Sequence, residues 1–315
     1  MSQTSFIDAL LPRGFRRNET LERISGLIAW ERLAPLLEQV RWGPNGRPPY
    51  DGLSMFKALL LQQWYGLSDP GLEEALLDRV SFRRFCGFAL DAETPDETTL
   101  RGFRNALKDA DLGEALFAEV ARQLEAAGFI LKTDTLIDAT LAPSSGRTPP
   151  SGSTPKDQES RSAHDPDANW TRRGQSRSLF FGYKARVDQG SGLIRSRLLT
   201  PAKTYEERGR RRLILGDEKA VYADKAYEEK ERWARGVKDR IQHRRHNYLK
   251  RLSPWQSLRN KLIGRMRSAV ERTFSVLKRR YGFSRMRYRG LKANAFHLDL
   301  PVIAHNLRTA AALTG

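Results

Sequence analysis

One stretch decides how this chain is interpreted: residues 258–280, LRNKLIGRMRSAVERTFSVLKRR. At about 100° of rotation per residue, its apolar side chains gather on one side of a helix, which is the pattern of an amphipathic helix. That side carries Leu262, Met266, Ala269, Val270, Thr273 and Leu277. The opposite side carries Gly264, Arg267, Glu271, Ser275 and Lys278. We therefore expect a helix with one apolar face and one cationic face.

Glu271 is the single acid in a strongly basic region, because residues 240–292 contain seventeen Lys and Arg residues and no other Asp or Glu. Two interpretations of this carboxylate are open. It can form an i,i+4 ion pair with Arg267, which contributes only about 0.2–0.5 kcal/mol to helix stability. It can also be a ligand of a metal ion. For an isolated helix the ion pair is the simpler interpretation, so the choice depends on whether other carboxylates accompany Glu271.

The composition indicates a globular protein with a polyanionic partner. The 315 residues suffice for two domains with separate cores. The net charge of +18 favours nucleic acid as the partner, ahead of an anionic membrane. No apolar run reaches the ~18–20 residues of a membrane span, and the N-terminus lacks the pattern of a secretory signal peptide. The single cysteine, Cys86, excludes an intramolecular disulfide and a cysteine-based zinc cluster. We expect a cytoplasmic, nucleoid-associated protein without a membrane or small-molecule partner.

Residues 1–125 predict an all-α N-terminal domain, because apolar residues recur at helical spacing. The expected helices cover residues 54–64, 73–85, 97–107 and 112–127. Ser68 or Asp69 can cap the second helix, with Pro70 in its first turn. The order of helix, turn and helix resembles a DNA-reading module, so this domain either contacts DNA or serves structure and dimerisation.

Residues 126–315 predict an α/β domain with a mixed sheet, because β-rich runs alternate with helical patterns. The expected strands are 129–141, 180–188, 193–199, 220–224 and 240–244. The expected helices are 205–215, 228–235 and 258–280. The Ser-, Pro- and Gly-rich stretch at about 143–178 predicts a long flexible loop.

Carboxylates on two of these strands accompany Glu271. Asp134 and Asp138 are four residues apart in one strand and project from the same face, and Asp224 ends another strand. Mg²⁺ binds a few carboxylate oxygens and takes further ligands from water and substrate phosphates. Two such ions about 3.5–4 Å apart can activate the attacking oxygen and stabilise the leaving oxygen of a phosphodiester displacement. Surrounding Lys and Arg would bind the DNA backbone.

Other chemistries find little support in the sequence. No serine–histidine or cysteine–histidine arrangement is convincing, and no glycine-rich loop of the P-loop type indicates ATP dependence. His243 and His246 lie beside Arg244 and Arg245, which favours contact with a polyanion or a structural role over zinc binding.

The chain resembles the DDE transposases of bacterial insertion sequences, most closely the insertion-sequence-5 family. The resemblance rests on IDATLAPSSG at 137–146, VYADKAY at 221–227 and the hairpin FFGYKARVDQGSGLI at 180–194. It rests also on the helix motif Y-x2-R-x3-E-x6-K, whose positions here are Gly264, Arg267, Glu271 and Lys278. Three of these four residues match, and Gly264 replaces the tyrosine. The resemblance covers about residues 40–310.

The resemblance implies a ribonuclease-H-like catalytic domain, a mixed sheet flanked by helices, at 126–315. It implies that Asp138, Asp224 and Glu271 are the catalytic residues and hold two Mg²⁺ ions, with Mn²⁺ as a substitute. Asp134 is then a supporting or solvated residue, because the family pattern places the ligand just before a small residue and Thr. We expect DNA contacts from Arg267, Lys278, Arg244, Arg245 and Lys184.

The implied function is that of a DNA transposase. Such an enzyme binds double-stranded DNA at the terminal inverted repeats of its element, cleaves the ends and joins the 3′-hydroxyls to target DNA. The resemblance also implies a homodimer assembled on two DNA ends. Two alternatives stay open: a catalytically silent DNA-binding repressor, and a plain metal-dependent nuclease of the same fold.

Overall fold

The computed structural model describes residues 18–40, 50–130, 134–146, 164–173, 178–190, 192–204, 213–225, 236–245 and 251–314. The chain divides into two compact units. The helical unit comprises Met1–Ala127, Arg280–Gly282 and Asp299–Gly315. The sheet unit comprises Gly128–Arg279 and Phe283–Leu298.

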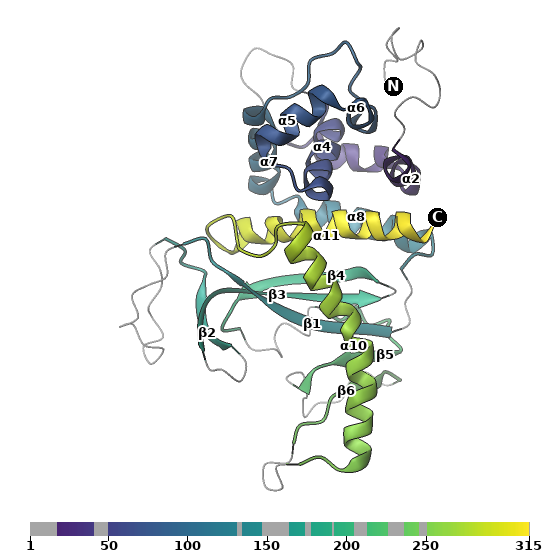
Figure 1. The fold of residues 1–315 in the computed structure, drawn as a ribbon, viewed down its shortest axis with the longest axis vertical. Helices are drawn as coiled ribbons and strands as arrows, with labels where there is room; N and C mark the ends of the chain where they lie inside the picture. Colours follow the sequence, from purple (N-terminus) through teal and green to yellow (C-terminus); the bar gives the residue numbers. More distant parts are fainter. Residues whose placement is uncertain are drawn as a thin grey trace. The chain divides into compact units, whose positions relative to one another are not determined.

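The helical unit begins with a series of short helices (Figure 1). They are α2 (Glu19–Leu27), η1 (Trp30–Leu33), α3 (Ala34–Leu37), α4 (Gly52–Tyr65), α5 (Asp69–Asp78), α6 (Val80–Cys86), α7 (Glu97–Asp109) and α8 (Gly113–Ala126). Asp51, Ser68 and Asp96 each accept a hydrogen bond from the backbone N–H three residues further along. These side chains cap α4, α5 and α7, since the first N–H groups of a helix have no partner within it. The series includes the helices expected at 54–64, 97–107 and 112–127.

The helix expected at 73–85 is two helices. α5 and α6 meet at Arg79, whose extended backbone (φ −100°, ψ 103°) interrupts the helical hydrogen bonding. Leu76 and Phe82, on either side of the break, are both buried. Each helix therefore presents an apolar face to the core. The helical spacing of apolar residues continues through Arg79, so this spacing alone predicts one helix where the structure has two.

The sheet unit contains a mixed sheet, which confirms the expected α/β class (Figure 1). Its strands are β1 (Asp134–Pro143), β2 (Asn169–Arg173), β3 (Ser178–Gly190), β4 (Leu193–Pro201), β5 (Ala220–Ala223) and β6 (Lys238–Ile241). The order is β2-β3-β1-β5-β6, and β4 pairs with β3 as the expected hairpin. β1 runs antiparallel to β3 and parallel to β5, and β5 runs parallel to β6.

The two faces of the sheet differ in character at β1. Successive side chains of a strand point to opposite faces, so Ile137 and Asp138 separate. Ile137 joins a buried apolar cluster with Leu213, Val221, Ala223 and Ile241. Asp138 faces α10, whose Arg267 contacts it. One face of β1 thus builds the core, and the other carries polar residues toward a basic helix.

α10 (Pro254–Arg280) confirms the basic helix and the burial of Val270, Thr273 and Leu277, but it corrects the rest of the expected apolar face. The side chains buried along it are Ile263, Arg267, Val270, Thr273, Phe274 and Leu277. Leu262 and Met266, expected on the buried face, are 52% and 46% exposed. Arg267, expected on the exposed face, is buried because its charge is compensated by Asp138.

α11 (Leu291–Leu313) has no counterpart among the expected elements. Every residue from Phe296 to Leu307 in the middle of the helix is buried, so the sequence there has no separate apolar and polar faces. Pro301 inside the helix further weakens the helical pattern of the sequence. Within the helical unit, the indole N–H of Trp64 donates to the backbone carbonyl of Ala304 at 2.9 Å.

Other expectations are corrected or lie outside the described residues. The loop expected at about 143–178 contains a strand, β2, and residues 147–163 and 174–177 are not described. The strand expected at 240–244 lies two residues earlier, as β6. The helix expected at 228–235, most of that at 205–215, and His246 fall outside the described residues. No described helix combines the length and apolarity needed to cross a membrane.

Candidate active site

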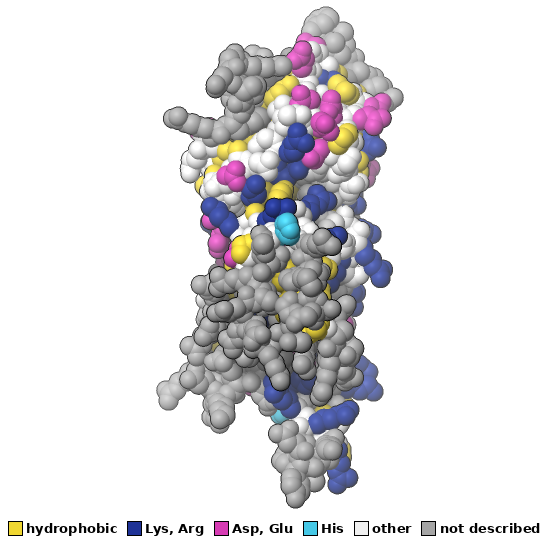
Figure 2. Space-filling view, turned by 90° about the vertical axis from the view of Figure 1, so that its left-hand side faces the viewer, with side chains coloured by type: hydrophobic (Ala, Val, Ile, Leu, Met, Phe, Trp, Pro, Cys, Tyr) yellow, Lys and Arg dark blue, Asp and Glu magenta, His cyan; other side chains and the backbone are white. Residues whose placement is uncertain are grey.

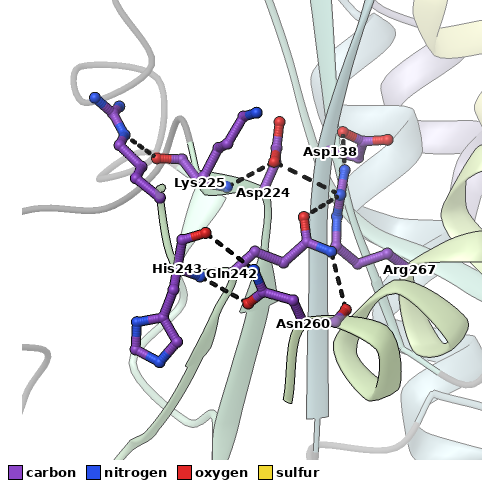
Figure 3. Close-up of polar contacts among 8 residues, drawn as sticks. Asp138, Asp224, Lys225, Gln242, His243, Asn260 and Arg267 are labelled. Atoms are coloured by element: carbon purple, nitrogen blue, oxygen red, sulfur yellow. Dashed lines mark hydrogen bonds and ion pairs between the residues drawn. The ribbon is translucent and has the colours of Figure 1, made fainter. Parts of the chain in front are cut away.

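Asp138 lies in β1, on the face that α10 covers. Its carboxylate oxygen Oδ1 accepts a hydrogen bond from Arg267 Nη2 at 2.9 Å (Figure 3). The Asp138 side chain is only 16% exposed. Burial raises the pKa of Asp138 above its usual value, the positive charge of Arg267 opposes this shift, and the negative charge of Glu271 adds to it. Asp138 is therefore a partly desolvated carboxylate whose negative charge is stabilised by a neighbouring cation.

Asp224 directly follows β5, the parallel neighbour of β1. The register pairs Leu136 with Tyr222. Asp138 and Asp224 each lie two residues beyond this pair, in the same direction along the two parallel strands. The Oδ1 atom of Asp224 lies 4.0 Å from Arg267 Nη1 and accepts a hydrogen bond from the backbone N–H of Lys225 at 2.7 Å. Asp138 and Asp224 thus approach one guanidinium from neighbouring strands.

The register also separates Asp134 from this site. Asp134 pairs with Ala220, at the start of both strands. Four residues of a strand span about 13 Å, so Asp134 begins β1 well away from Asp138. This spacing favours Asp138 over Asp134 as the partner of Asp224.

Arg267 projects from α10 between the two aspartates, and its side chain is 10% exposed. Its Nη1 atom also donates to Gln242 Oε1 at 3.3 Å. Gln242 in turn donates to the backbone carbonyl of Asn260 at 3.2 Å. The Asn260 side chain forms two hydrogen bonds with the backbone of His243, at 2.8 and 2.9 Å (Figure 3). The segment after β6 is therefore hydrogen-bonded to α10 close to the Arg267 guanidinium.

Sequence reasoning did not identify Gln242 and Asn260. Both act through contacts with segments distant in sequence, and no local motif marks either residue. Gly264 lies one turn before Arg267 on the same helix. A Cβ atom there would lie 3.5 Å from Gln242 Nε2, an ordinary van der Waals distance. The structure therefore has space for a Cβ atom at Gly264.

Glu271 lies about one turn beyond Arg267 on α10 and is exposed. Its charge reaches Asp138, since it contributes to the raised pKa of that carboxyl group. Within the described part of the chain, however, no three Asp, Glu, His or Cys side chains form a group able to hold a metal ion. The structure therefore brings Asp138 and Asp224 together around Arg267 and leaves Glu271 beside this pair.

The donor chemistry of the pair fits a hard divalent cation. Asp138 and Asp224 supply carboxylate oxygens, which Mg²⁺ and Mn²⁺ prefer. A cationic group, the Arg267 guanidinium, already lies within 2.9 and 4.0 Å of them. Asp138 and Asp224 would hold the ion, with Glu271 as the remaining carboxylate nearby.

The other predicted basic residues lie around the same strands. Lys278 Nζ donates to the backbone carbonyl of Leu141, so it anchors α10 to β1 at 3.2 Å. Arg244 is exposed, and its Nε donates to the backbone carbonyl of Lys225, next to Asp224, at 2.9 Å. Arg245 is exposed, and Lys184 is half-buried in β3.

Lys and Arg dominate the lower part of the sheet unit on the face shown in Figure 2, whereas acidic side chains gather over the helical unit. A polyanion approaching that part of the sheet unit would meet little repulsion.

Two family models match the sequence. Residues 131–307 match a family described as Transposase DDE domain, a match that covers more than half of the 315 residues. Residues 10–106 match a family described as Transposase domain (DUF772). No solved structure matches the chain.

Proposed function

Because this chain belongs to the Transposase DDE domain family and is a DDE transposase of the insertion-sequence type, we propose that Asp138, Asp224 and Glu271 are its catalytic carboxylates. The observation that carries the assignment is the convergence of Asp138 and Asp224 on one guanidinium. The three residues also match the family motifs in order along the chain. Within the family we propose the insertion-sequence-5 group, on the sequence motifs that the chain shares with it. We also propose a ribonuclease-H-like fold, which the mixed sheet and α10 support.

The proposed reaction is cleavage of phosphodiester bonds at the element ends, followed by joining of the 3′-hydroxyls to target DNA. When bound, two Mg²⁺ ions, or Mn²⁺ as a substitute, would activate the attacking oxygen and stabilise the leaving oxygen. Asp138, Asp224 and Glu271 would bind these ions. Asp138 is suited to this task because its carboxylate is largely removed from water, so a bound cation would stabilise a negative charge that water solvates little.

The proposed substrate is double-stranded DNA, bound through its phosphates. Arg244 and Arg245 are both exposed, and Arg244 contacts the backbone carbonyl of Lys225, next to Asp224. They would hold the backbone near the carboxylates, together with Lys184, Arg267 and Lys278. We further propose a homodimer that holds two DNA ends, one from each terminal inverted repeat.

The test is a cleavage assay on a labelled duplex that carries one end of the element, in Mg²⁺ or EDTA. Wild type, Asp138→Asn and Glu271→Gln would be compared with Glu74→Gln, an exposed helical glutamate far from the carboxylates in sequence. We expect Mg²⁺-dependent nicking at the element boundary in wild type and Glu74→Gln. Nicking should fall at least a hundredfold in the other two, because each loses a proposed ligand.

Each other outcome has a definite meaning. Cleavage by Glu271→Gln at the wild-type rate would remove Glu271 from the site. Binding without cleavage by wild type would favour a DNA-binding repressor. Cleavage without joining of the 3′-hydroxyl to a second duplex would favour a plain nuclease.

A further inference from the structure

Arg267 occupies the place where a divalent ion would have to bind. Its Nη2 lies 2.9 Å from Asp138 Oδ1 and its Nη1 lies 4.0 Å from Asp224 Oδ1. We infer that Arg267 holds the two aspartates together before metal binds, and that the guanidinium and the divalent ion compete for this carboxylate pair. The inference rests on the proposed function, since it concerns the same carboxylates, but it assigns Arg267 a role that DNA contact alone does not include.

The competition follows from charge and space. The Asp138 side chain is 16% exposed and that of Asp224 is 36% exposed, and the positive charge of the Arg267 guanidinium beside them offsets part of their negative charge. A divalent ion bound to the same oxygens would meet a like charge a few ångströms away, where the protein screens it less than water does. The guanidinium therefore has to move when the ion binds.

The released guanidinium has an evident acceptor in DNA. An arginine forms paired hydrogen bonds with the oxygens of a phosphate. The hydrogen-bonding capacity of Arg267 is not exhausted in the structure, because its buried Nε has no partner among the described residues. A DNA phosphate beside the carboxylates would draw Arg267 away from Asp138 and Asp224 and leave both free to bind the ion.

Metal binding and DNA binding are then linked. If DNA raises the affinity for the ion by some factor, the ion must raise the affinity for DNA by the same factor. In the absence of DNA, Arg267 keeps the carboxylate pair closed to metal. The protein would therefore load its ions mainly when a substrate phosphate is present.

The experiment measures Mn²⁺ affinity directly, by the loss of the free-ion electron paramagnetic resonance signal, with and without a short duplex. The variants are Arg267→Met, which removes the charge, and Arg267→Lys, which keeps it. The control is Arg272→Met, an exposed arginine on the same helix. Without DNA, we expect Arg267→Met to bind Mn²⁺ at least tenfold more tightly than wild type, and Arg267→Lys and Arg272→Met to bind no more tightly than wild type.

With DNA, the Mn²⁺ affinity of wild type should rise by a larger factor than that of Arg267→Met, because phosphate ligands raise both affinities and only wild type also releases a guanidinium from the carboxylates. A purely structural role for Arg267 predicts the opposite sign, because a disordered carboxylate pair would bind the ion more weakly. Equal or weaker Mn²⁺ binding by Arg267→Met would overturn the inference and leave the metal site standing. If no protein bound Mn²⁺ under either condition, the proposed metal site would fail together with the inference.

Discussion

At the scale of single residues, burial determines how two aspartates of the sheet unit titrate. Asp138 has Arg267 as its partner. Asp188 in β3 is fully buried, and neither of its oxygens has a hydrogen-bond partner among the described residues. Burial raises the pKa of Asp188 to about 7, although the charge of Arg195 opposes the shift. The same physical effect thus acts on a site residue and on a residue with no assigned role.

This pKa predicts how stability depends on pH. An aspartate in the unfolded chain has a pKa of about 3.9, so between about pH 4 and 7 the folded chain holds a proton on Asp188 that the unfolded chain has lost. Stability should therefore fall as pH rises through this window, and the full cost of the buried charge is present above about pH 7. Urea unfolding of wild type and Asp188→Asn at pH 5 and pH 8 measures the effect. The variant should lose less stability between the two pH values, and equal losses would contradict the prediction.

The residue scale also shows what a sequence can and cannot reveal about the site. Local motifs surround Asp138, Asp224 and Glu271, so the sequence could predict them as site residues, and their catalytic roles stay a prediction. The contact between Arg267 and Asp138 joins residues 129 positions apart, and no local pattern encodes it. Gln242 was missed for the same reason, since it contacts Arg267 from a segment 25 positions away.

At the scale of elements, α10 illustrates the difference between predicting a helix and predicting its orientation. Helical spacing identified the helix, but only part of the predicted apolar stripe packs: Val270, Thr273 and Leu277 are buried, whereas Leu262 and Met266 are exposed. Leu262 is 52% exposed, whereas Arg267 is buried against Asp138. Hydrophobic periodicity weighs each side chain by its own polarity, so it cannot anticipate a buried charge whose partner lies on a distant strand. α11 was missed for a related reason, because burial on all sides removes the periodic signal.

Two leucines of α10 test this orientation with the same substitution. Leu277 is fully buried, whereas Leu262 is exposed. Leu277→Ala should lower the free energy of unfolding by about 2–5 kcal/mol, because it removes buried methyl groups and leaves a cavity. Leu262→Ala should change it by less than about 1 kcal/mol, as expected of a surface position. Urea denaturation of both variants measures the difference, and similar losses would place Leu262 in a buried contact.

At the scale of the whole molecule, charge is the property most directly readable from sequence. The net charge of +18 indicated a polyanionic partner before any fold was considered, and the transposase families that match the chain agree with it. The division of the chain into two compact units is harder to predict from the sequence. No local pattern shows that Asp299–Gly315 belongs with the N-terminal segments, since that grouping depends on contacts across the length of the chain.

Salt dependence tests the proposed DNA path. Replacing Arg244 and Arg245 by Gln should weaken DNA binding and lower the slope of log affinity against log salt by about 2, because each phosphate contact releases about one counterion. Arg122→Gln is the control, since this exposed arginine is paired with Glu119. Fluorescence anisotropy with a labelled duplex at several salt concentrations measures the slope. An unchanged slope in the double variant would exclude Arg244 and Arg245 from the DNA path.

The hydrogen bond between Trp64 and Ala304 has a consequence for the order in which the protein can fold during synthesis. Its partners are 240 positions apart, and a ribosome adding about 5–20 residues per second needs roughly 12–48 s to cover that distance. Throughout that time the indole N–H of Trp64 cannot form this hydrogen bond, because Ala304 has not yet been synthesised. The helical unit begins to emerge first, yet it acquires its final helix only after the entire sheet unit has been translated.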